Sequence, residues 1–98
     1  MYNILMWEVI LNKKVCKDRE KLPSLVKYKL DLLLKELKVD GPYRNNWKNY
    51  GQLKGNSPTY HCHIKKGNPT YVVIWNIVNK KIKIMEVKYV GTHEKTPY

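Results

Sequence analysis

Acidic residues, cysteines and long apolar runs are all scarce in this chain of 98 residues. Its two cysteines, Cys16 and Cys62, are too few for the disulfide framework of a small secreted domain. No apolar run approaches the roughly 20 residues that a membrane-spanning helix needs. Residues 1–11 carry neither a basic segment nor the small-residue cleavage site of a signal peptide. Together these absences favour a cytoplasmic protein.

The shortage of acidic residues is concentrated in the second part of the chain. Overall, 19 Lys and Arg face 8 Asp and Glu, for a net charge of +11. Residues 1–40 hold nine basic and six acidic residues, whereas residues 41–98 hold ten basic residues and two acidic ones, Glu86 and Glu94. This segregated excess indicates a polyanionic partner. The alternative is that the charge serves solubility alone.

The first 40 residues predict a strand followed by two helices. Residues 2–11 are apolar enough for a strand that contacts other elements on both faces, and Asn12 can cap a helix that begins after it. Residues 13–22 favour a short charged helix, which Pro23 ends. Residues 24–38 predict a longer helix, which we expect to form a hairpin with the first. Its apolar stripe consists of Leu22, Val26, Leu30, Leu33 and Leu37, widened by Leu25, Leu32 and Leu34.

Residues 43–59 are predicted to form a long polar loop. Aromatic and basic residues alternate along it: Tyr43, Arg44, Trp47, Lys48, Tyr50 and Lys54. This pattern is typical of a surface that stacks bases and contacts phosphates. The alternative is that the aromatic residues pin the loop to the core. We favour that alternative for Trp47 and leave both open for Tyr50 and Arg44.

Residues 60–98 predict a meander of three strands. The strand-like runs are residues 60–65, 70–78 and 81–90, with turn residues at 67–69 and 79–80. The middle run is almost entirely β-branched and aromatic, as in a central strand. The whole chain therefore predicts a single α+β domain, residues 1–98, of order β-α-α-β-β-β. In it, a helical hairpin packs on one face of an antiparallel sheet.

All three histidines lie in this meander or just after it. His61 and His63 are two residues apart on one predicted strand, so they share a face, and His93 can reach the same groove from the end of the last strand. A histidine titrates near pH 6.5, so a pair can supply a neutral base and a charged acid. Lysines nearby can stabilise a phosphate: Lys65, Lys66 and Lys95. These groups meet the requirements for cleaving RNA through its own 2′-hydroxyl, without a metal or a cofactor.

Other interpretations of these residues stay open. His61-Cys62-His63 looks like a zinc ligand cluster, but Cys62 is predicted to point away from both histidines and into the core. Two or three imidazoles alone remain a possible metal site. His61 is equally well an ordinary polar residue of a solvated sheet face. Glu94 either orients the imidazole of His93 or is simply solvated.

The order of these elements resembles the RelE/ParE superfamily of bacterial toxins over nearly the whole chain. The most specific segments are REKLPSLVKYKL, YGQLKG and VKYVGTHEKTPY. The Gly-Thr-His near the end is similar to the YafQ-type branch, whose catalytic histidine follows the last strand. The resemblance implies that the first strand lies beside the last. It also implies a ribosome-associated mRNA endonuclease, an mRNA interferase, inhibited by a cognate antitoxin.

Carried over by position, the resemblance assigns roles to four residues. His93 matches the catalytic histidine, and His63 matches a strand histidine of the same branch. Tyr50 falls where that branch has a loop histidine, and Tyr98 lies near the terminal aromatic of many members.

The chain departs from the family pattern at the second meander strand. Many members have an arginine there, and the YafQ-type branch has an acid close by, but this chain has Pro69-Thr70-Tyr71. Either Lys65, Lys66 or Arg44 replaces the missing cation, or the case for a nuclease is weaker. The superfamily also includes ParE members that inhibit gyrase, and fold alone does not separate the two functions.

The three histidines favour RNA cleavage over the alternatives, a ParE-like gyrase inhibitor or a non-catalytic RNA-binding module. The predicted catalytic residues are His61, His63, His93, Glu94 and Tyr98. The predicted RNA contacts are Arg44, Tyr50, Lys54, Lys65, Lys66 and Lys95. An inhibitor of so basic a site is expected to carry an acidic segment that contacts some of these cations.

Overall fold

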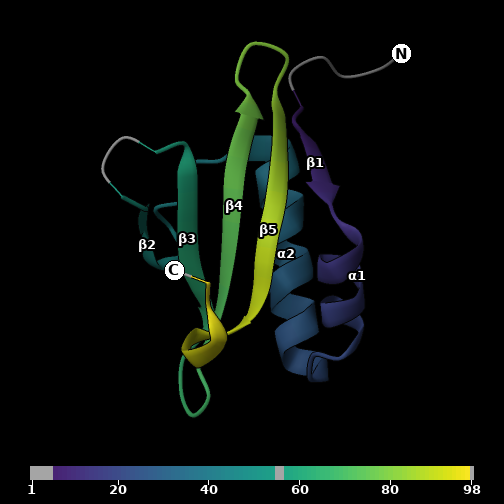
Figure 1. The fold of residues 1–98 in the computed structure, drawn as a ribbon, viewed down its shortest axis with the longest axis vertical. Helices are drawn as coiled ribbons and strands as arrows, with labels where there is room; N and C mark the ends of the chain where they lie inside the picture. The colour runs from purple at the N-terminus through teal and green to yellow at the C-terminus, as the bar shows by residue number, and fades with distance from the viewer. Residues whose placement is uncertain (1–5, 55–56, 98) are drawn as a thin grey trace.

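The computed structural model describes residues 6–54 and 57–97, and Figure 1 shows their arrangement. The elements, in chain order, are β1 (Glu8–Leu11), α1 (Lys13–Glu20), α2 (Ser24–Asp40), β2 (Lys48–Gln52), β3 (Thr59–Lys65), β4 (Tyr71–Asn79), β5 (Ile84–Thr92) and the short 3₁₀ helix η1 (His93–Lys95). The predicted α+β class is confirmed. Of the predicted first strand, residues 8–11 form β1, and residues 1–5 lie outside the described part. No helix within the described ranges combines the length and apolar character that crossing a bilayer requires.

The five strands form one sheet in the order β1-β5-β4-β3-β2. β1 is parallel to β5, which confirms that the first strand lies beside the last, and the other neighbours are antiparallel. Both α-helices lie on the same face of the sheet (Figure 1), where α1 packs on β5 and α2 packs on β3 and β1. The C-terminal segment turns onto the other face. Because the helices do not cover that face, it is the one on which a site can form.

The longer helix, α2, follows from its leucine spacing. Residues at intervals of three and four share one face of a helix, and these are completely buried against the sheet: Val26, Leu30, Leu33 and Leu37. Leu25 and Leu32 are 52% and 40% exposed, so the predicted widening of the stripe is wrong for these two residues. At 100° per residue they lie on the solvent side of the helix. Gly41, with φ of 94°, ends α2 as its amide donates to the carbonyl of Leu37 at 3.0 Å.

The core between helices and sheet has Trp75 of β4 at its centre. Its side chain is fully buried, and its indole Nε1 donates to the carbonyl oxygen of Pro42 at 3.0 Å. The neighbouring strands contribute further fully buried side chains: Cys62, Val73, Met85 and Val87. Truncating a buried tryptophan costs about 3–5 kcal/mol, so Trp75 anchors the central strand in the core.

The predicted loop at residues 43–59 contains a strand, β2, which is a correction. β2 pairs antiparallel with β3, with Lys48 opposite His63 and Gly51 opposite His61. Its sequence, KNYGQ, has no β-branched residue and one glycine, which explains why composition alone predicts a loop. The strand exists because the edge of β3 supplies hydrogen-bond partners, and it places a further element beside the histidines.

The turn between β4 and β5 is also longer than predicted. β5 starts at Ile84 instead of Lys81, and residues 80–83 form the turn, with Lys83 at φ of 58°. The strand then runs past Gly91 to Thr92. As a result, η1 and His93 follow the sheet without a loop between them.

Candidate functional site

The structure brings the three predicted histidines together on the face of the sheet opposite the helices. His61 and His63 point away from the core because Cys62 and Ile64, which alternate with them, are buried. The backbone amide of His93 donates to the carbonyl of Thr70 at 2.8 Å, which ties η1 to the start of β4. The imidazoles of His63 and His93 meet edge to face, with ring centroids 5.5 Å apart.

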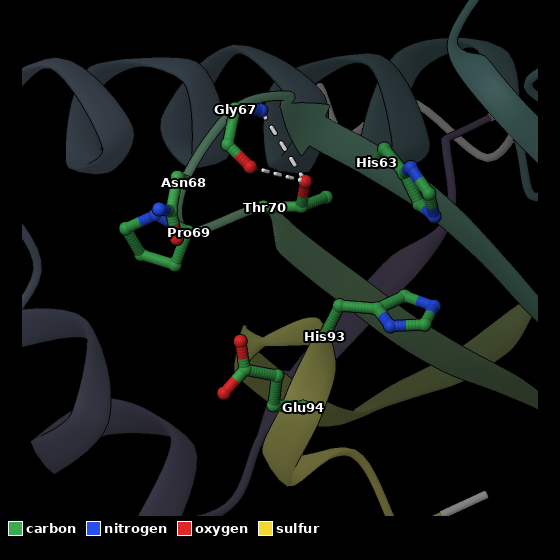
Figure 2. Close-up of a pocket in the computed structure, with 7 residues that line it drawn as sticks. All are labelled: His63, Gly67, Asn68, Pro69, Thr70, His93 and Glu94. Carbon is green, nitrogen blue, oxygen red and sulfur yellow. Dashed lines mark hydrogen bonds between the residues drawn. The ribbon is translucent and has the colours of Figure 1, made fainter.

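A cleft of about 270 Å³ opens beside this pair (Figure 2). It is lined by His63, Gly67, Asn68, Pro69, Thr70, His93 and Glu94. The hydroxyl of Thr70 donates to the carbonyl of Gly67 at 3.0 Å and accepts from the amide of Gly67 at 3.3 Å. The turn that forms one wall of the cleft is therefore closed by its own hydrogen bonds.

A second, smaller cleft of about 130 Å³ lies beside the same pair. His63 and His93 line both clefts, so the two are adjacent, and we call them together the histidine groove. The smaller part is lined by Leu53, His61, His63, Val72, Ile74, His93 and Thr96. β2 passes close to it, since a Cβ on Gly51 would lie 3.5 Å from Nε2 of His61.

Burial sets the charge state of the two strand histidines. Desolvation lowers the pKa of both His61 and His63 below the ordinary histidine value, and proximity to His93 adds to this effect. For His63, His61 and Lys66 lower the pKa further. Nδ1 of His63 is buried and has no hydrogen-bond partner among the described residues, so no acceptor raises its basicity. Both imidazoles are therefore favoured in the neutral, proton-accepting form.

Four lysines line a separate hollow that shares His63 with the histidine groove. This hollow next to His63 is lined by Lys29, Lys48, Lys65 and Lys66, along with Ile64. Lys65 and Lys66 belong to the predicted RNA contacts, whereas Lys29 and Lys48 do not. The pairing of β2 with β3 brings Lys48 opposite His63, and no local pattern reveals it.

Lys95 is placed differently from the prediction. It lines a separate cleft with Lys14 of α1 and with Lys21, which follows α1, next to Tyr71 and Tyr89. It is therefore directed away from the clefts that His63 and His93 share.

Arg44 holds the connection between α2 and β2. Its guanidinium is 3.1 Å from Oε1 of Glu36 and 3.8 Å from Oδ2 of Asp40. Asn46 and Trp47 each donate to the same Glu36 oxygen at 2.9 Å, which supports the interpretation that Trp47 pins this segment. Burial opposes the charge on Glu36, yet these hydrogen bonds leave its pKa below the ordinary value. Arg44 thus forms structural ion pairs with α2 and is not directed at the groove.

Tyr50 is also away from the groove. Its ring stacks on Tyr60 and Trp75, with centroids 6.0 and 6.2 Å apart, on the helix-facing side of the sheet. Among the remaining predicted residues, Lys54 follows β2 at φ of 49°, and Tyr98 lies outside the described residues.

Cys62 is a core residue. It is fully buried, and burial raises the pKa of its thiol to about 12, which leaves no thiolate for nucleophilic attack or metal binding. It faces away from His61 and His63, so the three consecutive residues do not converge. Across residues 6–54 and 57–97, no three His, Cys, Asp or Glu side chains are arranged to hold a metal ion.

A five-stranded sheet of this order, covered on one face by two helices, defines the RelE-like fold. No protein-family model and no curated protein matches the sequence. Among solved structures, the chain is similar to one from the archaeal RelE–RelB complex of Pyrococcus horikoshii OT3. The TM-score is 0.73 at 18% identity, covering 93% of this chain and 99% of that one.

Two bacterial structures are similar as well. One is an E. coli RelE toxin with two arginine-to-alanine substitutions, in the free state, with a TM-score of 0.68 at 20% identity, covering 91% of this chain and 85% of that one. The other is from the YoeB–YefM complex of Staphylococcus aureus, with a TM-score of 0.65 at 13% identity, covering 89% and 97%. At these identities the similarity establishes the fold and does not distinguish the YafQ-type branch.

Proposed function

We propose that this protein is the toxin of a toxin–antitoxin pair and cleaves mRNA on the ribosome, as a metal-independent endoribonuclease of the YafQ-like type. The observation that carries the proposal is the convergence of His61, His63 and His93 in one groove, with His63 and His93 in ring contact. The RelE-like fold supports the class. The lysines next to His63 supply the attraction for phosphate that such a substrate needs.

In the proposed reaction, His63 is the base and His93 the acid. Neutral His63 takes the proton from a 2′-hydroxyl, and the 2′-oxygen attacks the adjacent phosphorus. The bond from phosphorus to the 5′-oxygen breaks, and His93 donates a proton to that oxygen. The products are a 2′,3′-cyclic phosphate and a free 5′-hydroxyl. A charge on His93 disfavours a second charge on His63, so the pair holds one proton more readily than two.

The surrounding residues have supporting roles in this proposal. His93 is exposed, so water solvates its charged form. Lys65 and Lys66 stabilise the negative charge that develops on the phosphorane. They replace the arginine that many family members carry on the second meander strand. His61, beside Gly51 of β2, positions the RNA strand in the smaller part of the groove.

The proposal is tested with a His93→Ala variant. We expect it to abolish growth arrest on expression while its circular dichroism and thermal transition match the parent protein. With purified protein, ribosomes and mRNA, cleavage should survive EDTA and stop when the 2′-hydroxyl at the cleaved position is replaced by hydrogen. A folded His93→Ala protein that remains fully toxic contradicts the proposal. Gyrase inhibition without RNA cleavage would point to a ParE-like function.

The proposed partner is a cognate antitoxin. The RelE–RelB and YoeB–YefM structures are complexes of those toxins with RelB and YefM. For this chain, we propose an antitoxin with an acidic segment that covers the lysines next to His63, because residues 41–98 carry ten basic and two acidic residues. Such a segment competes with RNA phosphates for the same cations.

A further inference from the structure

Glu94 stands out because acidic residues are scarce around the histidine groove. The only other acid in residues 41–98 is Glu86, whose carboxylate lies 3.4 Å from Nζ of Lys88. Glu94 makes no hydrogen bond or ion pair with any residue that the structure describes. It lines the larger cleft, and Figure 2 shows its carboxylate turned toward the Pro69 side, away from the His93 ring. Glu94 therefore does not orient His93 in this structure.

An unpaired carboxylate in this position has a cost for a protein that binds RNA. Its charge repels the phosphates that Lys65 and Lys66 attract. The repulsion is avoided if the carboxylate contacts a neutral part of the substrate that donates hydrogen bonds. In single-stranded RNA, the unpaired bases expose such donors on their edges.

The chemistry of the carboxylate discriminates among the four bases. An ionised carboxylate has two acceptor oxygens and no donor. Guanine presents two adjacent donors on its Watson–Crick edge, N1–H and the N2 amino group. Adenine and cytosine place an acceptor next to their amino group, and uracil flanks its N–H with two carbonyl oxygens. Only guanine donates a hydrogen bond to both oxygens of Glu94. Each of the other bases would place one of its own acceptor atoms against a carboxylate oxygen.

The cleft around Glu94 suits one base. Its volume is about 270 Å³, and Pro69 and His93 give it a ring on either side of Glu94. Bases stack on imidazole rings in RNA-binding proteins. The hydroxyl of Thr70 is already bonded to Gly67, so it does not compete for the edge of the base. Because His63 and His93 also line this cleft, the base belongs to a nucleotide next to the cleaved phosphate.

We propose that the larger cleft is a guanine-binding subsite, in which Glu94 selects the base. This inference rests on the proposed ribonuclease function, because the cleft is taken as a subsite for the RNA that His63 and His93 cleave. It adds a sequence preference to that function: cleavage occurs next to guanine.

The test compares four RNAs that differ only in the base next to the cleaved bond. We expect single-turnover kcat/KM of the parent protein to favour guanine by roughly 10- to 100-fold, the discrimination of one good bidentate contact. Glu94→Gln replaces one acceptor by a donor at constant shape. It should reduce kcat/KM for the guanine RNA at least tenfold. The ratio of kcat/KM for the guanine RNA to that for the adenine RNA should then be close to one. Glu86→Gln, the matched control outside the groove, should keep both rate and preference.

The outcomes separate this inference from the function on which it rests. Equal cleavage of all four RNAs by the parent protein overturns the subsite, and so does a guanine preference that survives Glu94→Gln. A uniform loss on all four RNAs in Glu94→Gln overturns it too, since Glu94 would then act in catalysis. If no RNA is cleaved, the ribonuclease function fails. The subsite is then judged by binding of GMP and AMP to the protein, and GMP that binds no tighter than AMP overturns it.

Discussion

At the scale of single residues, burial is what distinguishes the strand histidines from His93. His61 and His63 are partly buried on the sheet, and desolvation lowers the pKa of each. His93 is exposed at the end of β5. A partly buried imidazole and an exposed one therefore meet at a centroid distance of 5.5 Å. In the proposed mechanism, the partly buried His63 is the base and the exposed His93 is the acid.

The two strand histidines should differ in their effect on cleavage. His63 contacts His93 and lines both parts of the groove, whereas His61 lines only the smaller part. We expect His63→Ala to lower the single-turnover rate by about 10²- to 10⁴-fold, as for a lost general base, and His61→Ala to lower it less. Rates of both variants under identical conditions decide the ranking. The reverse order would mean that His61 is the base.

The same histidines should make stability depend on pH. Their folded-state pKa values lie below the ordinary value near 6.5, so below that pH the unfolded chain binds more protons than the folded one. Their contribution is complete above about pH 6.5 and is lost as the pH falls through the folded-state pKa values. Urea unfolding at about pH 7.5 and about pH 5 measures this loss while carboxylates stay largely ionised. A His61→Gln/His63→Gln variant should lose less stability between these pH values, and an equal loss would contradict the assignment.

At the scale of elements, the end of β5 positions η1 and its histidine. Tyr89 donates from its hydroxyl to the carbonyl of Thr92 at 2.7 Å, so its ring lies across Gly91. A Cβ on Gly91 would be 2.6 Å from Oη and 2.9 Å from Cζ of Tyr89. Glycine is therefore required where the strand passes directly into η1.

A double-mutant cycle tests this contact. Gly91→Ala should destabilise the protein by about 1–3 kcal/mol, because the tyrosine ring or the strand must move. In a Tyr89→Ala background the same substitution should cost under about 0.5 kcal/mol, since the clash is gone. Urea unfolding of the four proteins gives both values. A cost that is equal in the two backgrounds would show that Gly91 is needed for another reason.

At the scale of the whole molecule, charge is distributed unevenly over the sheet. Lys48, Lys65 and Lys66 lie next to His63, whereas Lys80 and Lys81 lie on the β4–β5 turn, at the opposite end of the sheet (Figure 1). Charge reversal at either place changes the net charge equally. Comparing charge reversal of Lys65/Lys66 with that of Lys80/Lys81 thus separates the effect of charge next to His63 from the effect of net charge.

Reversing Lys65 and Lys66 to Glu should lower the affinity for single-stranded RNA. It should also make that affinity depend less on the salt concentration. If each of these lysines neutralises one phosphate, the slope of log K against log salt should fall by about 1.4. Lys80→Glu/Lys81→Glu should change it much less. Affinities measured at several salt concentrations give the slopes, and equal slopes for the two variants would mean that RNA does not follow the lysines next to His63.

The same variants test how the antitoxin inhibits. If its acidic segment covers these lysines, Lys65→Glu/Lys66→Glu should lower both its affinity and the salt dependence of that affinity. Unchanged affinity and salt dependence would mean that neutralisation uses another surface.

The sequence by itself determined the features that depend on short-range periodicity. The alternation of Tyr60, Cys62 and Ile64 with His61 and His63 decides which side chains face the core, because successive strand residues must point to opposite faces. The leucine spacing of α2 and the charge of residues 41–98 are likewise local. The fold class and the shared face of the strand histidines follow from these local patterns of apolar and polar residues.

Only the tertiary structure decided which other residues reach the groove. β2 is a strand because β3 offers it an edge, and that pairing brings Lys48 opposite His63. Glu36 of α2 engages Arg44, and the ring stack around Trp75 takes Tyr50 to the other face. These placements depend on hydrogen bonds and packing between residues distant in sequence. The residues involved carry no local periodic signal, so their partners appear only when the chain has folded.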